Sequence, residues 1–149
     1  MHPFNFRTAL LAKHAQHVVL IHFPIALFLA GVAFDFLARW KKQRLLAATA
    51  YYNFFAAALM TIPVLITGLL AWQWQLEGQR LKGILLMHLA AGCISSVLIW
   101  VVWFTHRRAH RDNTGNLPGY RLPLEAVSAA LVALTGHLGG FLSGVNGPG

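Results

Sequence analysis

Charged residues are scarce in this chain of 149 residues: Asp, Glu, Lys and Arg make up only 11% of it, whereas hydrophobic residues make up 57%. Soluble globular domains carry roughly 25% charged residues. A small soluble protein has a large surface relative to its volume, and so few charges cannot solvate that surface. We therefore expect lipid, not water, to cover most of the molecule.

Cysteine is nearly absent as well. Cys93 is the single one, so the sequence contains no disulfide framework, no CxxC or CxxCH motif and no thiolate zinc site. This excludes a covalently attached c-type haem. Paired carboxylates, a glycine-rich phosphate loop and a nucleophile–base set are also missing, so hydrolytic chemistry has no support. The basic residues stand in short clusters between apolar runs, which favours contact with lipid headgroups and argues against nucleic-acid binding.

Four apolar runs are each long enough to cross a bilayer, which takes about 20 residues in a helix. They cover residues 18–38, 46–72, 84–104 and 124–145 approximately. Their apolar residues occupy every side, as expected for helices in lipid. Because short connections force neighbouring helices to be antiparallel, we predict a single all-α membrane domain, a four-helix bundle that runs up-down-up-down.

The connections differ in positive charge. The first and third lie on one side and hold eight basic residues, whereas the other side holds four. The positive-inside rule then places both termini outside, in a multi-pass protein of the bacterial inner (cytoplasmic) membrane. Residues 1–17 mix apolar and basic side chains, and we expect them to be retained as a segment along the outer surface.

Eight histidines are present, and four of them gather at one depth. At ~1.5 Å rise per residue, His22, His88 and His137 all fall in the outer half of the membrane, and His17 marks its edge. An imidazole inside a bilayer is costly and usually faces the bundle interior with a partner. Several at one level predict a shared ligand.

Small residues accompany two of these histidines. Gly92 lies one turn after His88, and Gly140 lies close to His137. Small neighbours leave room for a flat macrocycle, and haem b needs that room together with an imidazole on each side of its iron. We therefore expect both glycines to belong to a haem pocket.

The first and third helices of an up-down bundle are diagonal, so their histidines can face each other across the core. We predict His22 and His88 as the axial pair of one haem b. His137 could replace one of them, or could hold a second haem together with His17.

Two alternatives remain open. Overlapping GxxxG steps in residues 136–144 are also typical of plain helix packing, and a membrane histidine often bonds a neighbouring hydroxyl or carbonyl. The chain would then be an accessory structural subunit of a larger respiratory or photosynthetic membrane complex. The other alternative is a copper or zinc ion bound by His22, His88 and His137.

The remaining polar residues near the spans have simpler interpretations. His106 and His110 stand among the basic residues of the third connection, where we expect both rings to be solvated. Asp35 is the only acid well inside a run, and Arg39 follows four residues later, a spacing that predicts an ion pair on the helix surface. A proton or quinol contact is the alternative for Asp35.

Two segments carry a resemblance: HVVLIHFP at residues 17–24 and TGHLGGFLSGVNG at residues 135–147. They resemble a widespread bacterial family of predicted membrane proteins that has an HP-x3-HFP opening, four spans, a histidine in the third span and a glycine-rich fourth. Val18 stands where that family usually has proline. The family positions correspond to residues of this chain as follows: His17, His22, Asp35, His88 and His137.

Members of that family occur fused to Rieske iron–sulfur or cytochrome c domains. The resemblance therefore implies electron transfer with a separate redox chain as partner. We predict a cytochrome b-like electron-transfer subunit, not a stand-alone enzyme, that carries electrons between quinol in the bilayer and that partner.

Overall fold

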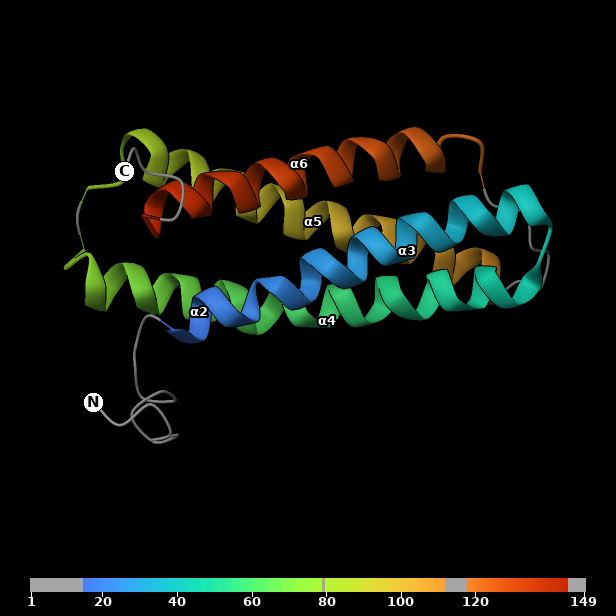
Figure 1. Cartoon of the computed structure of the whole chain (residues 1–149), viewed down its shortest axis with the longest axis horizontal. Helices are drawn as coiled ribbons and strands as arrows, with labels where there is room; N and C mark the ends of the chain where they lie inside the picture. Colours follow the sequence, from blue (N-terminus) through green and yellow to red (C-terminus); the bar gives the residue numbers. More distant parts are fainter. Residues whose placement is uncertain (1–14, 79, 112–117, 145–149) are drawn as a thin grey trace.

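The computed structural model describes residues 15–78, 80–111 and 118–144. The first predicted span consists of two helices, α2 (Ala15–Leu20) and α3 (His22–Lys41). The other three are α4 (Arg44–Gln75), α5 (Gly83–Arg111) and α6 (Arg121–Leu142). They lie side by side and alternate in direction, which confirms the predicted up-down-up-down bundle (Figure 1).

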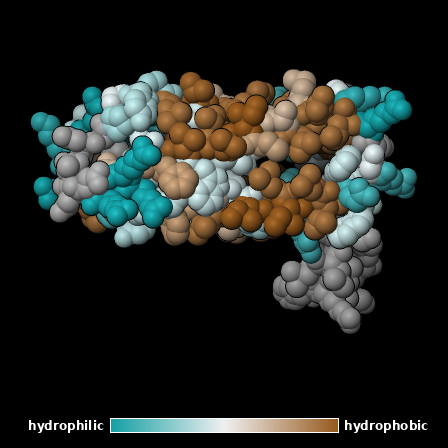
Figure 2. Space-filling view, turned by 180° about the vertical axis from the view of Figure 1, so that it is seen from behind, coloured by the Kyte–Doolittle hydropathy of each residue, from teal (hydrophilic) through white to brown (hydrophobic). Residues whose placement is uncertain are grey.

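All four spans are long and apolar enough to cross a membrane. Figure 2 shows the consequence on one face, where a hydrophobic band lies between two hydrophilic ends. Apolar side chains of all four spans, such as Val19, Ile66, Val97 and Val127, are more than half exposed. Such a surface is stable in lipid and would associate in water, so the protein is a membrane protein.

The bundle has an outer end, where α2 begins and α6 ends, and an inner end, which holds the α3–α4 turn (Figure 1). These names follow the charge-based prediction of orientation. The predicted interfacial segment at residues 1–17 lies largely outside the described residues, as does the predicted limit of the fourth span at residue 145.

Helix limits differ from the predicted ones mainly at the inner end. α5 continues to Arg111, beyond the expected end at residue 104. α6 begins at Arg121, although the apolar run starts at Leu124. Pro123 does not prevent this, because a proline in the first turn of a helix replaces an N–H that has no partner within the helix. Both extensions carry polar residues into the bundle.

A break at Ile21 divides the first span. Pro24 has no backbone N–H, so the carbonyl of Leu20 loses the donor that would continue the helix. At the break, the Ile25 nitrogen lies 3.4 Å from the Ile21 oxygen, a long hydrogen bond. The break is therefore a local weakening of the hydrogen-bond pattern, and Ile21 itself keeps helical backbone angles.

Each helix packs against its two neighbours in the ring α3–α4–α5–α6, so α3 and α5 are diagonal. The middle of the bundle is filled by one apolar cluster, whose members include Phe28, Phe54, Ile99, Val102 and Val132. These residues contribute from all four spans and leave a dry layer between the two ends. Polar side chains gather on either side of this layer.

Candidate cofactor site

A cavity of about 360 Å³ lies in the outer half of the bundle. This volume is within the range of cofactor and small-molecule sites, about 300–1,000 Å³. Five of the six residues predicted to bind a cofactor line it: His17, His22, His88, Gly92 and Gly140. Figure 1 shows α5 and α6 diverging from α2 and α4 at this end, and the cavity lies among these helices.

Two of the imidazoles that line the cavity lie close to each other. The ring centres of His17 on α2 and His88 on α5 are 6.4 Å apart, and the ring planes are nearly perpendicular at 84°. Each ring is held by the helix beside its own. His17 Nδ1 lies 3.3 Å from the Thr67 hydroxyl of α4, and His88 Nδ1 lies 3.1 Å from the Thr135 carbonyl of α6.

These contacts determine which ring nitrogen carries the proton in the neutral rings. A carbonyl only accepts, so His88 Nδ1 donates to Thr135. The Thr67 hydroxyl already directs its proton to the Pro63 carbonyl at 2.8 Å, so it accepts from His17 Nδ1. With Nδ1 protonated, the lone pair of each neutral ring is on Nε2, as in a metal-ligating histidine.

Glycine lies close beside both rings. A Cβ at Gly68 would lie 2.9 Å from His17 Cε1, and a Cβ at Gly139 would lie 3.1 Å from His88 Cε1. A side chain at Gly68 would require the His17 ring to shift, and one at Gly139 would require the His88 ring to give by a few tenths of an ångström. At Gly92 a Cβ would make an ordinary contact of 3.7 Å with Thr135, so this predicted residue lines the cavity without being sterically required.

The other two candidate histidines take different positions. His22 is exposed and lines the cavity, and its Nδ1 donates to the Val18 carbonyl of its own span at 2.7 Å. His137 is exposed, and its ring meets the edge of Phe141 at 4.9 Å. Among the described residues, His137 is not part of the cavity lining. The structure therefore brings His17 together with His88, and leaves His137 apart.

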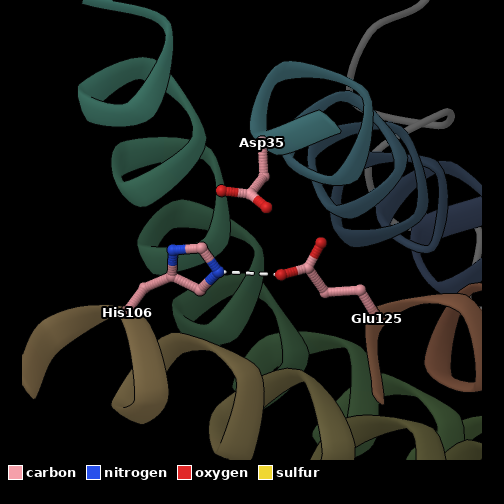
Figure 3. A group of neighbouring side chains, drawn as sticks. All are labelled: Asp35, His106 and Glu125. Carbon is pink, nitrogen blue, oxygen red and sulfur yellow. Dashed lines mark hydrogen bonds and ion pairs between the residues drawn. The ribbon is translucent and has the colours of Figure 1, made fainter. Parts of the chain in front are cut away.

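A second polar group lies at the inner end, below the apolar layer. It consists of buried Asp35 on α3, His106 on α5, and Arg121 and Glu125 on α6; we call these four residues the inner cluster. Arg121 Nε donates to Asp35 Oδ2 at 2.9 Å, and His106 Nε2 lies 2.8 Å from Glu125 Oε1. Figure 3 shows the imidazole and both carboxylates pointing into one space.

Asp35 corrects one expectation. The sequence predicted an ion pair with Arg39, but Asp35 is 1% exposed and bonds Arg121, a residue 86 positions away. Arg39 is exposed to the surroundings of the bundle. A carboxylate turned into a low-dielectric interior needs a partner there, and only the α6 residue reaches it.

The position of His106 also differs from the predicted one. It was expected to be solvated, yet it is 4% exposed, bonds Glu125 and packs its ring 4.7 Å from that of Phe54. The reason is the extension of α5, which keeps His106 on the buried face one turn beyond Val102. His110 is exposed, as expected, and stacks on Tyr51 with ring centres 4.5 Å apart.

A helical-spacing signal could have located the inner cluster. Four buried positions of α6 follow a spacing of three and four residues, and the first three of them are polar: Arg121, Glu125 and Ser128, followed by Val132. The same spacing in α5 joins Ser95, Ile99, Val102 and His106. Polar residues at the same spacing as apolar core positions lie on the same, buried face of the helix. The third connection was predicted to be a charged loop, so its residues were not assigned to these helix faces.

Comparison with known proteins gives one finding. A family model described as "Predicted membrane protein (DUF2231)" matches residues 13–147. No curated protein and no solved structure matches the chain.

Proposed function

Since this chain belongs to the DUF2231 family of predicted membrane proteins, we propose that it is a cytochrome b-like electron-transfer subunit that holds haem b between His17 and His88. The observation that carries the proposal is the close pair of imidazoles, with ring centres 6.4 Å apart. This assignment keeps His88 from the sequence-based pair and replaces His22 by His17.

The separation of the two rings fits ligation of one iron. Two metal–nitrogen bonds of about 2 Å, together with the distance from each nitrogen to its ring centre, place two axial rings roughly 6 Å apart. The 6.4 Å between His17 and His88 agrees with this arrangement. Their Nδ1 contacts to Thr67 and Thr135 support it further, because they leave the lone pair on Nε2 and fix the ring orientations.

The walls of the cavity support a flat, apolar guest. Gly68 and Gly139 keep side chains away from the two rings, and residues such as Ile25, Leu65 and Leu85 make most of the lining apolar. A bound haem b supplies a one-electron carrier. This chain would contribute two neutral ligands and a largely apolar surrounding, both of which tune the reduction potential of such a centre.

The wider setting of the proposal rests on charge. The excess of basic residues at the inner end favours a bacterial inner membrane protein with its cavity near the periplasmic side. The electron partner would be a separate redox chain or a larger membrane complex, and quinol is the candidate donor in the bilayer. His22 lies exposed at the cavity, where a lipid-soluble partner could reach it.

An absorption spectrum tests the proposal. We expect the full chain, purified in mild detergent and supplied with haem, to show a low-spin spectrum with sharp reduced α and β bands. His88→Ala and His17→Ala should each abolish the low-spin form, because each removes one axial ligand. His137→Ala is the matched control, since this exposed histidine does not line the cavity, and it should keep the wild-type spectrum.

Two results would contradict the haem proposal. A colourless protein that does not take up haem would rule out the haem site. Metal analysis of that preparation would then distinguish a copper or zinc site from an accessory subunit without a metal. An unchanged low-spin spectrum in His88→Ala would show that another residue ligates the iron.

A further inference from the structure

The inner cluster carries an inference independent of haem. We propose that Asp35, His106 and Glu125 form a binding site for one first-row divalent metal ion, with Arg121 as the positioning residue of Asp35. The site would lie at the inner end of the bundle. The apolar layer around Phe28 and Val132 separates it from the outer cavity.

The donor set is the first argument. One ligand atom from each of the three residues lies within 4.8 Å of the others, and the residues come from three helices, α3, α5 and α6. Metal–ligand bonds of about 2.1 Å place neighbouring donors closer than this, so small side-chain rotations complete the site. One imidazole with two carboxylates suits ions of the manganese, iron and zinc class.

An orphaned acceptor is the second, independent argument. Glu125 is 1% exposed, and its Oε2 has no hydrogen-bond partner among the described residues. Leaving a buried polar atom unsatisfied costs about 1–3 kcal/mol. Its other oxygen, Oε1, bonds His106. A metal ion bound between the carboxylate and the imidazole satisfies both groups; it takes the place of the proton on His106 Nε2, and the neutral ring then carries its proton on Nδ1.

Charge is the third argument. Two carboxylates face a single guanidinium, so the cluster has one net negative charge while His106 is neutral. Uncompensated charge is costly in a buried place, and a cation relieves it. The neighbouring basic residues Arg39, Arg107 and Arg108 oppose a cation, but all three are exposed, where solvent and salt screen their charge.

Arg121 fits the role of a positioning residue. It donates to Asp35 Oδ2 and so fixes the orientation of the carboxylate within the inner cluster. Ligating carboxylates are commonly oriented by such outer hydrogen bonds. A metal ion would reach the site over a short distance from the inner end of the bundle. Arg121 is the first residue of α6, and Asp35 lies six residues, about 9 Å, before the end of α3.

Binding of Mn²⁺ to the full chain, followed by electron paramagnetic resonance after chelator treatment, tests the proposal. Mn²⁺ prefers carboxylates, so it discriminates against the imidazole-rich outer cavity. We expect one saturable Mn²⁺ per chain, with spin-echo modulation from a single imidazole nitrogen, and displacement by Zn²⁺. Glu125→Gln should weaken binding by at least about tenfold. His88→Ala, in the outer cavity, is the matched control and should bind Mn²⁺ like the wild type.

Any other outcome contradicts the proposed metal site. Absence of saturable Mn²⁺ binding by the wild type, or the same affinity in Glu125→Gln, would mean that the cluster holds only a proton. Loss of Mn²⁺ binding in His88→Ala would show that the ion binds in the outer cavity. Should Glu125→Gln fail to fold by circular dichroism, His106→Gln replaces it, and the nitrogen modulation of the wild type remains an independent readout.

Discussion

Thr135 shows how much one side chain can organise. Its carbonyl accepts from His88 Nδ1, and its hydroxyl donates to the Leu131 carbonyl, so the same hydroxyl accepts from Ser95 at 3.1 Å. Both contacts tie α5 to α6 at the cavity. In a membrane interior, where water is scarce, a polar group must find such partners within the protein. The orientation of His88 thus depends on α6 more than on its own helix.

The buried ion pair Asp35–Arg121 leads to a prediction about stability. Removing one charge leaves the other uncompensated, which typically costs 3–5 kcal/mol, whereas removing both is far less costly. We expect Arg121→Gln and Asp35→Asn to destabilise the bundle strongly, and the double variant to cost much less than their sum. Unfolding in detergent, followed by circular dichroism, measures this. Additive losses would show that the two residues are not coupled.

At the scale of the element, helical spacing separates the two histidines of the first span. His17 and His22 are five residues apart, which on a helix turns their side chains about 140° from each other. Ile21 between them keeps helical backbone angles, and the structure has His17 beside His88 while His22 bonds its own span. A predicted span shows its length well, but not which of its side chains will meet a partner on another helix.

The weakened hydrogen bonding at Ile21 leads to a prediction for Pro24→Ala. The new N–H can bond the Leu20 carbonyl and join α2 and α3, so amides near residues 21–25 should exchange hydrogen more slowly. A changed low-spin spectrum of the haem-loaded protein would show that the break also affects the position of His17. Pro123→Ala is the matched control, because Pro123 is also the third residue of its helix but lies at the inner end. Wild-type exchange in Pro24→Ala would contradict the role given to Pro24 at the break.

At the scale of the whole molecule, the protein has two polar levels and a dry layer between them. His88 and His106 lie on one helix, 18 residues or ~27 Å apart. Phe28, Phe54 and Val132 fill the space between these levels and are almost completely buried. An electron carrier at the outer level and a metal ion at the inner level would therefore act separately, each reached from its own side.

Orientation in the membrane gives a prediction for the whole molecule. Single cysteines at Lys82→Cys, in the α4–α5 connection, and Lys41→Cys, at the end of α3, mark the two ends in a Cys93→Ala background. If the basic end is cytoplasmic, a membrane-impermeant maleimide should label only Lys82→Cys in intact bacterial cells. Both should react after permeabilisation. Labelling of Lys41→Cys alone would invert the assigned orientation.

Hydrophobicity and chain length by themselves determined that this protein is a bundle of four membrane helices. The free energy of placing about 20 apolar residues in lipid is a sum over residues and does not depend on their neighbours in space. Depth along each helix predicted that His88, Gly92, Gly140 and His137 belong to one site in the outer half; the first three line a cavity there, and His137 is not part of its lining. That they bind a cofactor stays a prediction.

Only the tertiary structure decided which polar groups meet. Asp35 bonds Arg121 and not Arg39, His106 is buried with Glu125, and His17, in place of His22, lies beside His88. These choices depend on the rotation of each helix about its axis and on how far α5 extends. Such features follow from packing between helices that are distant in sequence, and a single imidazole or carboxylate contains no information about the partner it will meet.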